Sequence, residues 1–364
     1  MVGGSSLVLL IIFSGVVMSA ETGEQAPVPD PPTEETEAMD GLGPIDAADF
    51  FPEVRDDLTE VTWAHRVNSQ AELEAMLKDD KIMMLEADVL SGKLRDSEEK
   101  AKEGEREGES STSPIMAHPP EKESDLTVAM WLDQVIQANQ GGKRKGIKLD
   151  FKELSVVKES LEELVKRKEE MTFPIWLNAD ILPGPSSRNT PVPSTDFLTT
   201  CAELFPQATL SLGWTTFVAP NSPAVESGYS REHFEAMVQA LDTHAITQPV
   251  TFPIRAAFVP HSIENLEWLL ENTPDSTVTI WSSPQDPFDP EAIKTLVDIL
   301  GHNAVYLDLP ETQMTQYRDV AAAAAAAEGA SKGAPFCLLP TSASAWASVG
   351  MALATALAAL YLYE

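Results

Sequence analysis

The sequence predicts an α/β fold, most simply a single (β/α)8 TIM-like barrel with an appended hairpin after its second strand. Three observations support this prediction. Short apolar runs rich in β-forming residues alternate with amphipathic helical stretches over residues 49–318. That region of about 270 residues is close to the usual barrel size of about 250. A charged insertion that lacks apolar residues separates the second run from the third.

The expected strands and helices follow one another in order along this region. The strands are predicted over 61–65, 82–88, 114–118, 146–151, 174–180, 209–214, 252–258, 277–282 and 304–309. Helical patterns, with apolar residues three and four positions apart, cover 71–79, 127–136, 154–170, 197–205, 231–241, 263–272 and 291–300. Nine strands are one too many for a closed eight-stranded barrel.

The insertion at residues 91–113 resolves this count. It contains almost no apolar residue, so it offers no face that could pack as a crossover helix. A parallel connection needs such a packed crossover, whereas antiparallel strands do not. We therefore expect segments 82–88 and 114–118 to pair as a hairpin, which leaves eight parallel strands for the barrel.

The amino-terminal segment is typical of a secreted protein. Residues 1–20 hold an apolar run from Leu7 to Val17 that ends in small residues, which is the layout of a signal peptide. The alternative, a membrane anchor, requires a run of about 20 residues. Residues 21–48 are acidic and Pro-rich and are expected to form a linker, because they carry too few large apolar groups to fold.

The carboxyl-terminal segment predicts attachment to a membrane. Residues 319–344 form an Ala-rich stalk and spacer, and residues 345–364 form an apolar end. No Lys or Arg follows Lys332, which favours a signal for a glycosylphosphatidylinositol (GPI) anchor over a single-pass helix. The expected location is the extracellular face of the plasma membrane, reached through the secretory pathway.

Charge and cysteine content exclude some classes of function. The chain has 25 Lys plus Arg against 57 Asp plus Glu, a formal net charge of -32, so binding to nucleic-acid phosphates is excluded. Its two cysteines, Cys201 and Cys337, provide neither a disulfide framework nor a zinc site.

Polar residues are concentrated where the first four predicted barrel strands and the hairpin arm end, which is where the active site of such a barrel lies. They are His65, Glu86, Asp88, His118, Asp150, Lys152, Asn178 and Asp180. Buried charges are costly unless they are paired or bind a metal. Three carboxylates can bind Mg²⁺ or Ca²⁺, two imidazoles can act as base and acid, and a lysine can neutralise a phosphate. The main candidates are therefore Glu86, Asp88 and Asp150 as metal ligands and His65, His118 and Lys152 as catalytic residues.

Each residue taken alone also has a plain structural interpretation. A single histidine is more often structural than catalytic, and the Glu86 and Asp88 pair can form an ion pair with Lys148 or Lys152. The weaker site candidates are Asn178, Asp180, Trp214 and Arg255. The first two can hydrogen-bond the next loop, the tryptophan can be a packing residue, and the arginine can be a counter-charge or a phosphate ligand.

Seven separated segments of the chain match one known family. They are WAHRVNS, MMLEADV, IMAHPP, GIKLDFKE, IWLNADILPGP, TLSLGWTT and VTFPIRAA, in this order. With these motifs the sequence resembles the menorin family from about residue 61 to residue 308. Menorins in turn look like members of the phospholipase-C-like phosphodiesterase superfamily, which includes glycerophosphodiester phosphodiesterases and the sphingomyelinase-type phospholipases of spider venom.

The resemblance implies a metal-dependent phosphodiesterase. His65 and His118 fall where that superfamily has its acid-base pair, Glu86, Asp88 and Asp150 where it has metal ligands, and Lys152 on the lysine of a D-x-K motif. The expected reaction is hydrolysis, or intramolecular transesterification to a cyclic phosphate, of a lipid-like diester or a glycerophosphodiester. The alternative is a catalytically silent extracellular co-receptor that binds protein partners, because a fold does not dictate a function.

Overall fold

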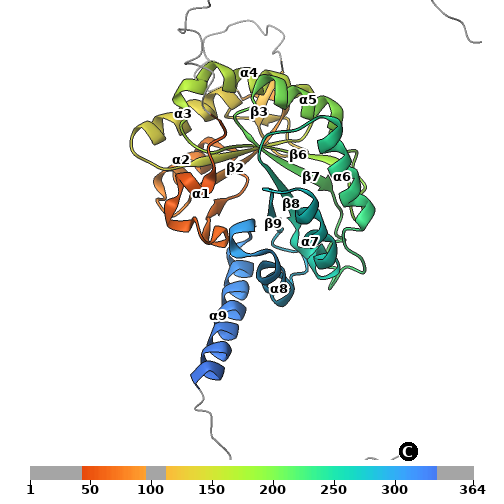
Figure 1. Cartoon of the computed structure of the whole chain (residues 1–364). Helices are drawn as coiled ribbons and strands as arrows, with labels where there is room; N and C mark the ends of the chain where they lie inside the picture. The colour runs from red at the N-terminus through yellow and green to blue at the C-terminus, as the bar shows by residue number, and fades with distance from the viewer. Residues whose placement is uncertain (1–42, 96–111, 334–364) are drawn as a thin grey trace, which may run out of the picture. The chain divides into compact units, whose positions relative to one another are not determined.

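The computed structural model describes residues 43–95 and 112–333 (Figure 1). The predicted signal peptide, most of the linker, the larger part of the charged insertion and the carboxyl-terminal apolar segment lie outside the described residues. Among the helices that are described, none is both long enough and apolar enough to cross a bilayer.

Eight parallel strands form a nearly closed barrel. In their spatial order these strands are β1 (Trp63–Ala64), β2 (Met84–Leu94), β5 (Gly146–Phe151), β6 (Ile175–Pro183), β7 (Thr209–Thr215), β8 (Val250–Arg255), β9 (Thr277–Trp281) and β10 (Val305–Asp308). Each neighbouring pair is parallel. Strands β1 and β10 are the two edges, and no ladder joins them in the described residues. The prediction of an α/β fold with eight parallel strands is confirmed.

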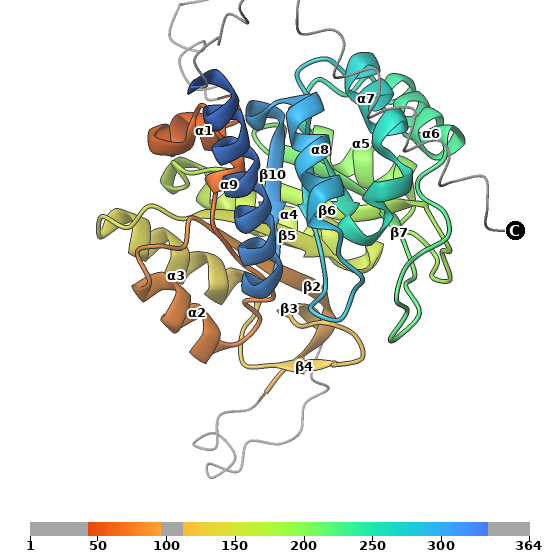
Figure 2. The ribbon, with the colours of Figure 1, turned by 90° about the horizontal axis from the view of Figure 1, so that it is seen from below.

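Helices cover the outside of the strands (Figures 1 and 2). They are α2 (Gln70–Lys78), α3 (Val128–Gln140), α4 (Val157–Arg167), α5 (Ser194–Leu204), α6 (Arg231–Thr243), α7 (Ile263–Asn272) and α8 (Pro290–Leu300). Their first residues follow ordinary capping chemistry: Ser69 and Glu72 form a capping box at α2, and Asp289 precedes a proline at α8.

Two short strands pair with the carboxyl-terminal half of β2. Strand β3 (Ser113–Met116) pairs antiparallel with β2 from Val89 to Gly92, and β4 (Glu123–Ser124) pairs parallel with Lys93 and Leu94. The connection between β2 and β3 lies outside the described residues. Strand β2 is longer than the predicted segment 82–88 because these two partners satisfy the backbone groups of its outer half.

Two other elements differ from the sequence-based expectation. The predicted strand 252–258 ends at Arg255, and Ala256–His261 forms a 3₁₀ helix instead. A short buried apolar run does not distinguish a strand from a helical turn, so the pattern could not show this boundary. Helix α9 (Glu311–Gly333) runs through the seven alanines, since alanine is the best helix former. Figure 1 shows it packed against the barrel near α8 and then extending away.

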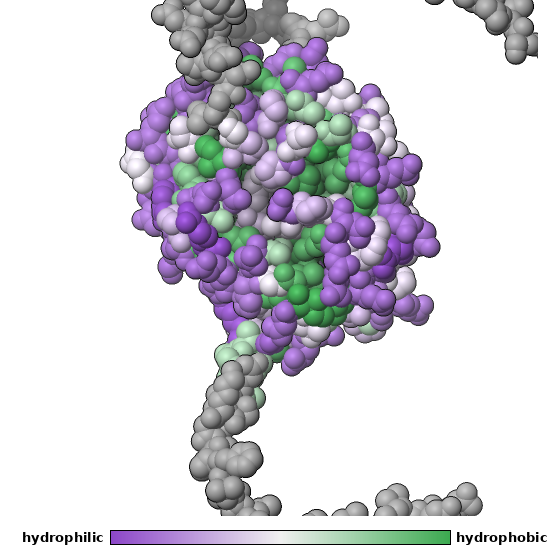
Figure 3. Space-filling view, viewed as in Figure 1, coloured by the Kyte–Doolittle hydropathy of each residue, from purple (hydrophilic) through white to green (hydrophobic). Residues whose placement is uncertain are grey.

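Aromatic side chains fill the barrel interior at the amino-terminal ends of the strands. The rings of Trp63, Trp176 and Tyr306 contact one another, with centroids 4.9 to 6.3 Å apart. Their contacts bring β1, β6 and β10 together below the polar layer that carries the candidate site. The face seen in Figure 1 is mostly hydrophilic, with smaller apolar areas between charged side chains (Figure 3).

Candidate active site

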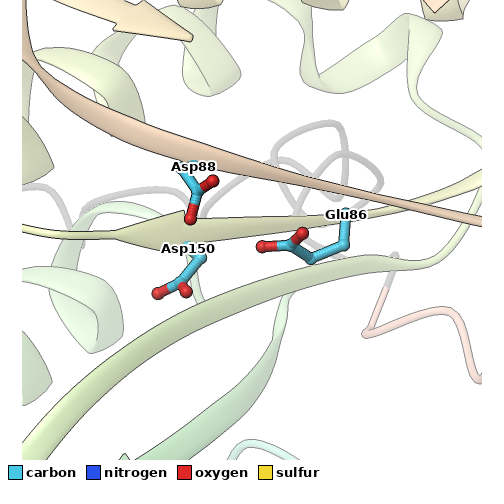
Figure 4. A group of neighbouring side chains, drawn as sticks. All are labelled: Glu86, Asp88 and Asp150. Carbon is cyan, nitrogen blue, oxygen red and sulfur yellow. The ribbon is translucent and has the colours of Figure 1, made fainter. Parts of the chain in front are cut away.

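Three carboxylates lie together on the neighbouring strands β2 and β5, near the carboxyl end of β5. Glu86 and Asp88 are two residues apart on β2 and therefore on one face, and Asp150 is the register partner of Asp88 on β5. One oxygen from each of the three lies within 4.8 Å of the others. Figure 4 shows the three groups gathered between the two strands. Glu86 and Asp88 are each 1% exposed, so the cluster is buried.

Neighbouring amide groups hold the three carboxylates in place. One oxygen of each accepts a hydrogen bond of 2.7 Å, from Arg66 N to Glu86, from Asn68 Nδ2 to Asp88 and from Asn178 Nδ2 to Asp150. Ser211 in turn donates to Asn178 Oδ1 at 2.6 Å. Arg66 has a φ of 61°, a left-handed conformation that is uncommon outside glycine and is found most often at functional sites.

Lys152 bridges two of the carboxylates. Its Nζ lies 2.7 Å from Asp88 Oδ1 and also contacts Asp150 Oδ2. Burial alone would raise the pKa of Asp150, but the ammonium group of Lys152 outweighs burial and lowers it. The same carboxylates raise the pKa of Lys152, so this pair stays charged.

His65 joins the two edges of the barrel. It follows β1, and its Nδ1 lies 3.1 Å from Asp308 Oδ2 at the end of β10 and 3.6 Å from Glu86 Oε2. Burial lowers the pKa of His65, but the carboxylates of Glu86 and Asp308 outweigh burial and raise it to about 9. The side chain remains 43% exposed, on the cavity side.

His118 approaches the same cavity from β3. Its Nδ1 donates to Pro119 O at 2.7 Å, so Nε2 is the nitrogen left for other partners. His65 has the same arrangement, because its Nδ1 is taken by Asp308. Both imidazoles therefore keep Nε2 available, and both line the cavity.

All the predicted site residues except Trp214 line one cavity of about 580 Å³. Its far wall is formed by Arg255, Trp281, Asp180 and Thr216. A second polar groove of about 420 Å³ shares His65, Arg66 and His118 with it. The histidines thus lie where two polar spaces meet.

The far wall carries two of the weaker candidates. One edge of the Arg255 guanidinium, Nε and Nη2, forms a bidentate ion pair with Asp286, with N–O distances of 2.6 and 2.7 Å. Burial and the charge of Asp150 raise the pKa of Asp180 to about 7. The β6–β7 register shifts directly after Asp180, and such irregularities are frequent next to active sites.

Trp214 does not belong to this cavity, which corrects the expectation that it was a site candidate. Its side chain is 1% exposed and packs against Tyr229, Phe234 and Phe252, and its Nε1 donates to His233 O. Trp214 is at a strand end like the other candidates, but its ring faces the helices that surround the barrel. Its role is in the core.

The three carboxylates fit a hard divalent cation. Burial and the charges of Asp88 and Asp150 raise the pKa of Glu86 to about 7, although His65 and Lys148 lower it in part. Within the described residues, Glu86 Oε1 accepts no hydrogen bond. Oxygen ligands of this kind are the ones that Mg²⁺ and Ca²⁺ prefer. A divalent ion would give this oxygen a partner and would reduce the repulsion between the three carboxylates.

Sequence reasoning missed four polar residues of this region: Asn68, Lys148, Asp286 and Asp308. Asp308 is the last residue of β10 and lies one residue before the end of the predicted strand 304–309, so the strand-end rule that found the others applies to it as well. Lys148 precedes Asp150 by two residues and so shares its face of the strand. Asn68 and Asp286 lie in loops, and only the folded arrangement identifies them.

Comparisons with known proteins match the barrel region. The Menorin N-terminal domain family model matches residues 57–314. The human protein "Protein FAM151B" is 37% identical over 265 residues, which cover 72% of this chain and 87% of that protein.

Likenesses among solved structures are weak. An oxaloacetate acetylhydrolase is 12% identical with a TM-score of 0.37, over 82% of this chain and 92% of that one. A putative phosphonomutase from Burkholderia cenocepacia is 10% identical with a TM-score of 0.36, over 78% of this chain and all of that one. Neither likeness bears on the chemistry of the site.

Proposed function

The chain belongs to the menorin family, and from this premise and its site we propose that it is a metal-dependent phosphodiesterase. One observation carries the proposal. Two histidines with free Nε2 atoms and a buried cluster of three carboxylates line the same cavity. A hydrolase of phosphodiesters needs both parts. The carboxylates would hold the metal ion that binds the charged phosphate, and the histidines would transfer protons.

Glu86, Asp88 and Asp150 are the residues that would hold Mg²⁺ or Ca²⁺. When bound, the ion would neutralise charge on the phosphate and act as a Lewis acid. Lys152 orients two of these ligands, since its ammonium group contacts both Asp88 and Asp150, and it lowers the pKa of Asp150.

The histidines would act as general base and general acid. One Nε2 removes the proton from a hydroxyl group, either of the substrate or of water, as the oxygen of that group bonds to phosphorus. The bond between phosphorus and the leaving oxygen then breaks, and the other Nε2 donates a proton to that oxygen. A substrate hydroxyl gives a cyclic phosphate, and water gives the hydrolysed product. Asp308 fixes the ring of His65 for this task.

The direct test is turnover of a panel of glycerophosphodiesters and lysophospholipids with Mg²⁺, with Ca²⁺ and with EDTA. His65→Ala and His118→Ala are expected to keep bound metal and to lose about 10² to 10⁴ in rate. Lys294→Met is the control, because Lys294 pairs with Asp298 on α8, away from the cavity. If no diester is turned over although the metal binds, the barrel is better explained as an extracellular scaffold for protein partners.

We also propose that the protein is secreted and held at the cell surface by a GPI anchor. The support is the layout of residues 1–20 and 345–364 in the sequence. Treating expressing cells with phosphatidylinositol-specific phospholipase C should release the protein into the medium. Retention with an intact carboxyl terminus would favour a spanning helix.

A further inference from the structure

Lys148 is a buried cation for which the described residues supply no hydrogen-bond or ion-pair partner. Its side chain lies in the barrel interior on β5, is 4% exposed and lines the cavity. Within the described part of the chain, its ammonium group forms neither a hydrogen bond nor an ion pair. The other buried lysine nearby differs, because Lys145 Nζ donates to two backbone oxygens, Asp79 O and Ile82 O, at 2.5 Å.

The charge of Lys148 lowers the pKa values of Glu86, Asp150, Asp180 and Asp308, but Lys148 forms no ion pair with any of these carboxylates within the described residues. The Nζ atom lies over the ring of Trp63, 5.7 Å from the centroid, where the π face attracts a cation. Its register partners are Glu86 on β2 and Trp176 on β6. Although Glu86 is on the adjacent strand, its carboxylate makes no ion pair with Lys148 and turns instead to His65 and Arg66 N.

The other cations of the cavity are already occupied. Lys152 contacts two carboxylates, and the Arg255 guanidinium forms a bidentate ion pair with Asp286 through one edge and donates to Thr216 Oγ1 from Nη1. Arg66 approaches Asp88 at 3.8 Å and is 56% exposed. An anion that enters the cavity would give the ammonium group of Lys148 a charge-assisted hydrogen bond that the described residues do not supply. Lys148 is therefore the cation on the cavity wall whose binding capacity is unused in the described residues.

We propose that Lys148 is the phosphate-binding cation of the site. Its ammonium group donates to a non-bridging oxygen of the phosphodiester from the floor of the cavity and stabilises the negative charge that grows there during cleavage. This inference rests on the proposed phosphodiesterase function. It assigns to Lys148 the contact with phosphate that the sequence had favoured for Lys152, whose ammonium group is committed to Asp88 and Asp150.

The alternative is that Lys148 only balances the charge of the carboxylates. The two roles predict different effects of replacing Lys148 on binding affinity. A phosphate ligand controls the affinity for an anion, whereas a counter-charge controls the affinity for the metal ion, because removing a cation near the carboxylates tightens cation binding.

The test is calorimetric titration of inorganic phosphate into the full-length protein saturated with Mg²⁺ or Ca²⁺. Lys148→Met is expected to weaken phosphate binding about 10- to 100-fold, the usual value of a charge-assisted hydrogen bond. Lys148→Arg should retain most of the affinity, and Lys294→Met should leave it unchanged. Equal phosphate affinity in wild type and Lys148→Met, or metal binding without any phosphate binding, would overturn the inference and leave the metal site standing. Absence of metal binding in the wild type would instead contradict the proposed function as a metal-dependent phosphodiesterase.

Chemical labelling provides a second measurement if Lys148→Met does not fold. Reductive methylation of the metal-loaded wild-type protein, mapped by mass spectrometry, should modify Lys148 slowly when phosphate is present and faster when it is absent. The exposed Lys158 serves as the internal control for reagent activity. Equal modification of Lys148 with and without phosphate would contradict the inference.

Discussion

Replacing Glu86 by glutamine should stabilise the metal-free protein at alkaline pH. Glu86 is 1% exposed, and burial with the charges of Asp88 and Asp150 raises its pKa from 4.5 to about 7. Glutamine has the same shape, and its oxygen can still accept the hydrogen bond from Arg66 N. The substitution therefore removes a buried charge at little cost in packing.

The sign and size of the change in the free energy of unfolding follow from proton linkage. The folded chain holds a proton on Glu86 that the unfolded chain has already lost, so the free energy of unfolding falls as the pH rises from 4.5 to about 7. Each unit of pKa difference corresponds to about 1.4 kcal/mol, which gives an upper value of about 3 kcal/mol. His65, 3.6 Å away, compensates part of the charge and loses this partner in the variant. We expect a gain of about 1 to 3 kcal/mol at pH 8 and almost none at pH 4.5.

The assay is urea unfolding with EDTA at both pH values. Glu267→Gln, on the exposed face of α7, is the control and should leave stability unchanged at both. Adding Mg²⁺ or Ca²⁺ should stabilise the wild type and not Glu86→Gln, which reverses the order of the two proteins. Destabilisation of Glu86→Gln at pH 8 without metal, or an equal gain at both pH values, would refute the reasoning.

Two further substitutions test the geometry around the site. Asp308→Asn should lower kcat about 10- to 100-fold with little change in metal affinity, because it weakens the contact that orients His65 and leaves the three carboxylates of the metal site unchanged. Steady-state kinetics measure kcat, and calorimetry measures the metal affinity. A loss of metal binding would contradict this role of Asp308. Gly213→Ala places a methyl group 2.5 Å from Asp180 Oδ1 and 2.9 Å from Pro253 Cγ. The free energy of unfolding should therefore fall by about 1 to 3 kcal/mol, which thermal unfolding measures. An unchanged melting temperature would show that these two neighbours shift without cost.

Much of the site was predictable because parallel strands all end at the same side of the barrel. That rule places His65, Glu86, Asp88 and Asp150 together from the order of apolar runs alone, and the structure brings them together. It fails for Trp214, since a strand end does not reveal which face a side chain takes when both faces are buried.

Contacts between distant segments were not predictable in the same way. Asp308 reaches His65 only because the sheet curls until β10 lies near β1, although 243 residues separate the pair. Asn68 orients Asp88 from a loop whose conformation no local pattern indicates. Within the described residues Lys148 has no ion-pair partner, because Glu86 contacts His65 and Asp88 contacts Lys152. These contacts arise only in the folded protein and cannot be read from the sequence motif.

The central claim is that Glu86, Asp88 and Asp150 bind a divalent cation. Its most direct test is calorimetric titration of Mg²⁺ and Ca²⁺ into the intact protein and into Asp88→Asn and Asp150→Asn, with folding of each variant checked by circular dichroism. The account predicts a single ion per chain in the wild type and none in either folded variant. Absence of binding in the wild type, or unchanged binding in the variants, would contradict it.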